Sequence, residues 1–161
     1  RRQRRPWELT SVALRTIGLF LLAITVSASS EPPYTDLNNG QLETLLGQGV
    51  PVYDIRRPQE WQQTGIIEGS RLLTFVDSDG RLLPDFFSRF TGQTAKDEPV
   101  VLICRTGSRT RTLARYLVEE LGYTQVYNVR SGIRQWITDG RAVTRIGRSE
   151  TDTAREAGAQ L

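Results

Sequence analysis

The sequence predicts an α/β protein with a mostly parallel central sheet and helices on both faces. Short apolar runs typical of strands alternate with segments of helical spacing over about 110 residues. The clearest unit is the apolar run 99–103, which leads through a short glycine-containing loop into a helical pattern at 109–121. Ligands of such sheets bind at the carboxyl ends of strands, so we expect a site just after residue 103.

The other elements are expected in the following order. Before the central unit we expect a helix over 36–46, strands over 50–55 and 72–73, and helices opening at 56–61 and covering 84–90. Pro58 fits the first turn of the second helix. Turns or polar loops are expected at 65–70, 77–80 and 91–98. After the central unit we expect a strand over 125–129 and a last helix from Ser131 and Gly132 to 139–140, with Trp61 and Trp136 in or near the core.

The first 28 residues resemble a targeting segment. An arginine-rich start precedes an apolar stretch at 17–26, and Val26, Ser27 and Ala28 provide small residues near a cleavage point. We expect a signal peptide over 1–28 and a periplasmic or secreted protein; the alternative is a membrane anchor through residues 9–28. A linker is expected over 29–35, a folded domain over 36–146, and a polar, disordered tail over 147–161.

The basic character of the chain resides in this segment. Residues 1–28 carry five arginines and one glutamate, which leaves 16 basic and 17 acidic residues in the rest. The remaining domain has no basic excess, so we expect no nucleic-acid partner. We also expect a monomer, and no stable membrane association after cleavage of the signal.

Cys104 is the only cysteine of the chain, and it stands directly after the central strand. It cannot form an internal disulfide, and in an oxidising compartment a free thiol is either used or well buried. A strand, a tight loop and a helix start together point backbone N–H groups at an anion, which favours the thiolate. Arg105 and Arg109 add two cations to this loop. A lone cysteine is often only a small buried hydrophobe, but that alternative does not require the loop Arg105, Thr106, Gly107, Ser108 and Arg109.

Four stretches in order resemble the rhodanese family over about 36–146. They are Asp54-Ile55-Arg56-Arg57-Pro58-Gln59-Glu60-Trp61, the glycine turn 65–70, the loop from Cys104 to Arg109, and Tyr127-Asn128-Val129-Arg130-Ser131-Gly132 followed by Trp136. The combination is similar to secreted single-domain thiosulfate sulfurtransferases. Where the family often has histidine in the glycine turn, this chain has Ile66, and it contains no histidine at all.

The resemblance implies a single rhodanese-like domain that is a thiosulfate sulfurtransferase. The Cys104 thiolate would take a sulfane sulfur from thiosulfate or a similar donor as a persulfide, and cyanide or a thiol, possibly on a protein, would accept it. Arg105, Thr106, Gly107, Ser108 and Arg109 would bind the substrate. Asp54, Arg56 and Glu60 would support the loop as an ion pair and a helix cap. We expect no metal and no cofactor apart from the covalent persulfide.

Two other functions stay open at this stage. One is a persulfide carrier or sulfur-relay module with little turnover. The other, less favoured, is a cysteine phosphatase or arsenate reductase, whose related folds use an arginine six positions after the cysteine. Here that position is Thr110 and the arginine comes one residue earlier, so the shorter loop favours a single sulfur atom over a bulkier oxyanion.

Overall fold

The computed structural model describes residues 31–147. The expected signal peptide and the expected tail from 148 onward lie outside these residues, and both stay predictions. No helix within 31–147 combines the length and the apolar character that crossing a membrane requires.

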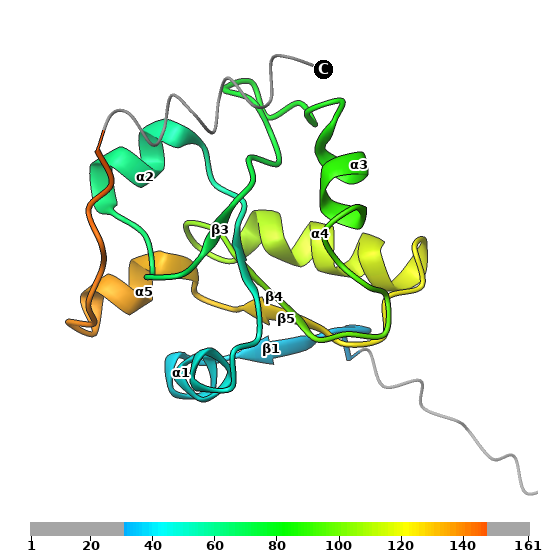
Figure 1. The fold of residues 1–161 in the computed structure, drawn as a ribbon, viewed down its shortest axis with the longest axis horizontal. Coiled ribbons are helices and arrows are strands. Elements are labelled where there is room, and N and C mark those ends of the chain that lie inside the picture. Colours follow the sequence, from blue (N-terminus) through cyan, green and yellow to red (C-terminus); the bar gives the residue numbers. More distant parts are fainter. Residues whose placement is uncertain (1–30, 148–161) are drawn as a thin grey trace, which may run out of the picture. The chain divides into compact units, whose positions relative to one another are not determined.

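Within residues 31–147, five parallel strands form one sheet in the order β1-β5-β4-β2-β3 (Figure 1). Their bounds are Thr35–Leu37 for β1, Val52–Asp54 for β2, Arg71–Leu72 for β3, Val100–Ile103 for β4 and Val126–Val129 for β5. Strand β4 lies between β5 and β2, and all four of its residues are buried. The predicted parallel α/β class is therefore confirmed.

Five helices complete the domain described by the structure. They are α1 (Asn39–Gly47), α2 (Pro58–Thr64), α3 (Phe86–Thr91), α4 (Ser108–Glu119) and α5 (Gly132–Thr138). Helices α3 and α4 pack on one face of the sheet around Phe86, Phe90, Leu113 and Leu117. Helices α1 and α5 pack on the other face around Leu42, Ile133 and Trp136. The expected helices on both faces are confirmed, and Trp61 and Trp136 are buried as predicted, with 1% and 5% of their surface exposed.

The first strand is not predicted by the sequence pattern. Residues 35–37 are expected to end a linker and begin a helix, but they pair with β5, and Tyr34 is buried in the core. Asn38 follows this strand and caps α1, because its side chain accepts the N–H of Gln41 while the Gln41 side chain accepts the N–H of Asn38. A three-residue edge strand has too few positions to show alternation, so only its pairing with β5 reveals it.

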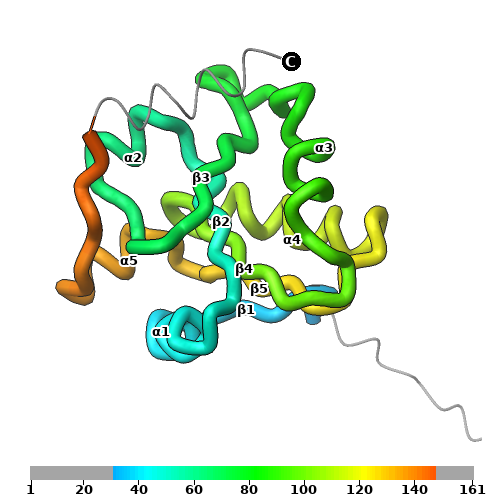
Figure 2. The backbone as a smooth tube through the Cα atoms, in the orientation of Figure 1, coloured from blue at the N-terminus to red at the C-terminus, as the bar shows by residue number. Residues whose placement is uncertain are grey.

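Other boundaries differ from expectation by one or two residues. The second helix begins at Pro58 rather than at 56, and the third begins at Phe86 rather than at 84. Figure 2 shows how the chain leaves β3, rises beside α2, and enters α3 before it returns to β4. This long connection borders the carboxyl edge of the sheet, where Cys104 lies.

Candidate active site around Cys104

Cys104 follows the last residue of β4 and is 1% exposed. The backbone N–H of Gly107 donates to its Sγ at 3.2 Å, and the Thr110 hydroxyl lies 3.4 Å from the same sulfur. Thr110 also donates to the Gly107 carbonyl at 3.1 Å. The sulfur is therefore enclosed by the loop that it begins, with polar groups of that loop beside it.

The carbonyl side of this loop is held by the start of α5. The N–H of Ile133 donates to the Cys104 carbonyl at 2.9 Å, and the N–H of Arg134 donates to the Arg105 carbonyl at 3.1 Å. Because a trans peptide places its N–H opposite its carbonyl, the N–H groups of Arg105 and Thr106 point away from α5. The contact orients two peptide units of the loop before any substrate arrives.

Two glycines permit this close approach. Gly107 has φ +87°, and a Cβ there would lie 2.0 Å from the Arg130 carbonyl oxygen. Gly132 has φ +60°, and its Cβ would lie 2.5 Å from the Arg105 and Cys104 carbonyl oxygens. Both positions therefore require glycine on two grounds, the backbone conformation and the space.

Glu60 connects α2 to the loop. Arg109 donates to its two carboxylate oxygens at 2.6 and 2.8 Å, and the N–H of Arg57 donates at 3.1 Å. Burial raises the pKa of Glu60, but the hydrogen bonds from Arg109 and Arg57 outweigh it and hold the pKa at about 2. Burial alone would lower the pKa of Arg109. The hydrogen bond and charge of Glu60, together with the charges of Cys104 and Asp54, outweigh burial and raise this pKa.

Asp54 and Arg56 form a second, deeper ion pair. The closest contact is 2.7 Å, and both side chains are at most 1% exposed. Arg56 also donates to the Gly65 carbonyl at 2.9 Å and to the Thr64 hydroxyl at 2.7 Å. The pair therefore ties the end of β2 to the end of α2.

The structure divides the predicted substrate-binding residues into two kinds. Gly107 is buried and contacts the sulfur, and both terminal nitrogens of Arg109 contact Glu60. Arg105, Thr106 and Ser108 are exposed, with the two hydroxyls 3.2 Å apart. Arg109 is thus placed to position the loop, while Arg105, the residue after Cys104, carries an exposed cation.

Thr110 and Gly132 belong to the site although the sequence pattern does not assign them to it. In the sequence, Thr110 is only the residue that stands where a phosphatase would have arginine. Its contact with Sγ follows from the first turn of α4, which returns the side chain two residues after Ser108 to the loop. Gly132 is expected as a helix start, and its role appears only when α5 lies against the loop.

The described residues contain no group of three His, Cys, Asp or Glu side chains placed to hold a metal ion. What the site offers is one thiol, a backbone hydrogen-bond donor directed at it, and cations nearby. This combination suits a sulfur nucleophile that carries a negative charge.

Comparison with known proteins agrees with this chemistry. Residues 38–139 match the family model for the rhodanese-like domain. A curated protein named thiosulfate sulfurtransferase GlpE from Pseudomonas syringae pv. syringae is 30% identical over 98 residues, which cover 61% of this chain and 82% of that protein. The GlpE of Actinobacillus pleuropneumoniae serotype 3 is 36% identical over 109 residues, covering 66% and 90%.

Solved structures share the fold. Rv0390 from M. tuberculosis matches with a TM-score of 0.53 and 25% identity over 62% of this chain and 80% of that one. The polysulfide-sulfur transferase of Wolinella succinogenes matches with a TM-score of 0.57 and 19% identity over 72% and 82%. Since the family model spans most of the described domain and includes the whole loop around Cys104, the chain belongs to the rhodanese-like domain family.

Proposed function

We propose that the protein is a sulfurtransferase that moves a sulfane sulfur from thiosulfate, or a similar donor, to cyanide or a thiol acceptor through a persulfide on Cys104. The observation that carries the proposal is the Cys104 sulfur, held inside the loop with the Gly107 N–H donating to it at 3.2 Å. The curated relatives named thiosulfate sulfurtransferase support the same reaction class.

The first half-reaction loads the sulfur. The Cys104 thiolate attacks the outer sulfur of thiosulfate, a new S–S bond forms, and the S–S bond of thiosulfate breaks with sulfite as the leaving group. The exposed Arg105 guanidinium is available to the sulfonate oxygens of the donor. Fixed loop donors stabilise the charged terminal sulfur without reorganising, because α5 and Glu60 hold the loop.

The second half-reaction unloads it. An acceptor attacks the outer sulfur of the persulfide, and the Cys104 thiolate leaves. The mechanism needs no histidine, which agrees with a chain that has none.

Replacement of the thiol tests the proposal. Cys104→Ser nearly preserves the side-chain volume, so the protein should fold, but it should lose all but about 1% of its thiosulfate-to-cyanide transfer because an alcohol cannot hold the sulfur. Mass spectrometry of the wild-type protein after thiosulfate treatment should show one added sulfur atom, and the variant should show none. Transfer above a few per cent in the variant would overturn Cys104 as the carrier.

The same assays separate the other functions. Stoichiometric persulfide without turnover would indicate a carrier. Hydrolysis of an aryl phosphate at a rate comparable to sulfur transfer would contradict the sulfurtransferase proposal. Insertion of one glycine between Gly107 and Ser108 should strongly lower sulfur transfer, because the longer loop shifts Arg109 and Thr110, which contact Glu60 and Sγ, relative to the thiol.

A further inference from the structure

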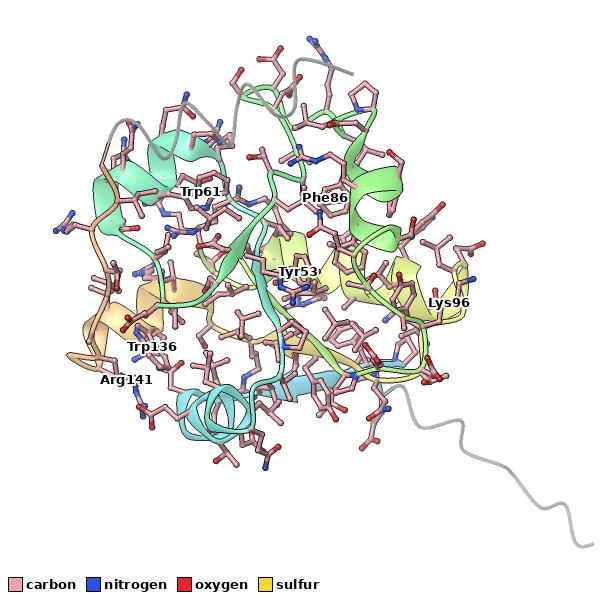
Figure 3. All side chains as sticks on the ribbon, in the orientation of Figure 1. Tyr53, Trp61, Phe86, Lys96, Trp136 and Arg141 are labelled. Atoms are coloured by element: carbon pink, nitrogen blue, oxygen red, sulfur yellow. The ribbon has the colours of Figure 1, made fainter. Side chains whose placement is uncertain are left out.

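A cavity of about 600 Å³ lies between α2, the segment that follows β3, and the start of α3. Trp61, Leu72, Val76 and Leu83 provide apolar lining. Figure 3 shows Trp61 on α2 and Phe86 on α3, on the two sides of the segment that follows β3. The volume suits a ligand of a few residues, which is larger than thiosulfate or cyanide.

The cavity lies at the same edge of the sheet as Cys104. Its lining includes Thr74 and Val76, which follow β3, whereas Cys104 follows β4. Only β2 separates these two strands, so the lateral distance is roughly 10 Å at about 4.8 Å per strand. Arg57, a wall residue, and Arg109, at the end of the catalytic loop, both contact the Glu60 carboxylate. The cavity is therefore a neighbour of the proposed sulfur-transfer site.

Two arginines line the cavity, and their side-chain contacts are long. Arg57 Nε is 3.4 Å from Glu60 and its Nη1 is 3.5 Å from the Ser78 carbonyl, while Arg89 Nη1 is 3.4 Å from Asp85. The tight contact of Arg109 with Glu60, by comparison, is 2.6 Å. A guanidinium has five N–H donors in a planar fork that matches a carboxylate. Both arginines can therefore accommodate an additional anionic group.

Two acidic groups, Asp77 and Asp85, also line the cavity, and Asp77 is already engaged. One carboxylate oxygen of Asp77 already accepts the N–H groups of Asp79 and Arg81 at 2.9 and 2.8 Å. Asp85 is the partner in the 3.4 Å contact of Arg89, so an incoming carboxylate would share Arg89 with it. The cavity consequently combines apolar walls with guanidinium groups, which complements an organic molecule that carries a carboxylate.

We propose that this cavity binds the sulfur acceptor, and that the acceptor is a short cysteine-containing peptide whose carboxylate pairs with Arg89 and Arg57. Three extended residues span roughly 10 Å, which equals the two-strand lateral spacing between the cavity and Cys104. This inference rests on the proposed sulfurtransferase function and adds the class of acceptor.

The peptide takes the sulfur in a single displacement. The peptide thiolate attacks the outer sulfur of the Cys104 persulfide and forms a peptide persulfide. The S–S bond to Cys104 breaks, Cys104 leaves as a thiolate, and the proton of the peptide thiol goes to water. No external oxidant or reductant is needed.

A double comparison tests the carboxylate contact. The acceptors are cysteinyl-glycyl-glycine and its C-terminal amide, assayed with wild type and with Arg89→Gln. In wild type the amide should have a KM about fivefold higher, and in Arg89→Gln the two acceptors should differ by less than about twofold. Arg115→Gln is the matched control, because Arg115 also pairs with an acidic residue four positions away but does not line the cavity. It should retain the wild-type ratio.

Filling the cavity is the second test. Val76→Phe should raise the KM for cysteinyl-glycyl-glycine about fivefold more than the KM for cyanide, because cyanide needs no cavity. Equal effects on both acceptors, or an acid-to-amide ratio that survives Arg89→Gln, would overturn the inference.

Binding without turnover separates the two proposals. Cys104→Ser titrated calorimetrically with S-methylated cysteinyl-glycyl-glycine should release binding heat that Arg89→Gln in the same background reduces. If wild type fails to transfer sulfur to cyanide, the proposed function fails, and this titration alone decides whether the cavity binds the peptide. Absence of binding heat would reject the cavity as a peptide site even if cyanide turnover is normal.

Discussion

Two arginine–carboxylate pairs, Asp54–Arg56 and Glu60–Arg109, differ in their surroundings. Asp54 and Arg56 are at most 1% exposed, whereas Arg109 and Glu60 are 24% and 11% exposed at the side chain. The first pair joins residues two positions apart, and the second joins residues 49 positions apart. The first therefore belongs to the interior of the fold, and the second belongs to the site.

Their hydrogen bonds show the same difference. Arg56 donates to Asp54, Thr64, Gly65 and the Glu60 carbonyl, so its removal leaves several buried acceptors without this donor. Within residues 31–147, the side chain of Arg109 donates to Glu60 through both terminal nitrogens. Breaking a buried pair costs more than losing a partly exposed one, because the remaining charge cannot reach water. We therefore expect the Asp54–Arg56 pair to contribute mainly to stability and the Arg109–Glu60 pair mainly to the position of the loop.

The largest expected loss of stability comes from breaking the buried Asp54–Arg56 pair. Arg56→Met should lower the free energy of unfolding by about 3–5 kcal/mol, since it leaves the Asp54 carboxylate buried and unpaired. Urea denaturation followed by circular dichroism measures this loss. A loss below about 1 kcal/mol would contradict the distinction between the two pairs.

For the Arg109–Glu60 pair we expect the opposite result, a small loss of stability and a large loss of activity. Arg109→Met should cost only about 1–2 kcal/mol of stability but lower the kcat for sulfur transfer about tenfold, because Glu60 no longer fixes the start of α4. Steady-state kinetics with thiosulfate and cyanide measures the effect. Arg109→Lys should recover part of the lost kcat. If Arg109 only stabilised the fold, this variant would recover stability and kcat in the same proportion. An unchanged kcat in Arg109→Met would refute the positioning role.

Acid titration provides the smallest and most specific comparison. Glu60 has a pKa of about 2 in the folded protein against an ordinary value of 4.5, so its stabilisation is present above pH 4.5 and is lost as the pH falls towards 2. In Arg109→Met this pKa should return towards its ordinary value. Wild type should therefore lose about 1 kcal/mol more than the variant between these pH values, after allowance for solvent screening. Parallel stability curves for the two proteins would show that the pair does not perturb Glu60.

The surface pair of Arg115 and Glu119 serves as the reference for all three measurements. It is about half exposed and joins two turns of α4. Arg115→Gln should change the free energy of unfolding by less than about 0.5 kcal/mol and leave the kcat unchanged.

Much of the molecule was predictable from local sequence. The strand before Cys104, the helix after it and the parallel sheet follow from apolar periodicity, because each pattern spans only a few residues. The position of the thiol at a strand end follows from the same pattern. These features depend on neighbours along the chain, so one sequence suffices to predict them.

The tertiary structure decided what depends on contacts between distant segments. Strand β1 exists because it pairs with β5, and Arg109 contacts Glu60 because the first turns of α2 and α4 meet. The need for glycine at positions 107 and 132 arises from backbone oxygens of distant residues, which would lie 2.0 and 2.5 Å from the Cβ of any other residue there. No periodicity encodes such approaches, because they are properties of packed backbones and not of the side-chain order along one segment.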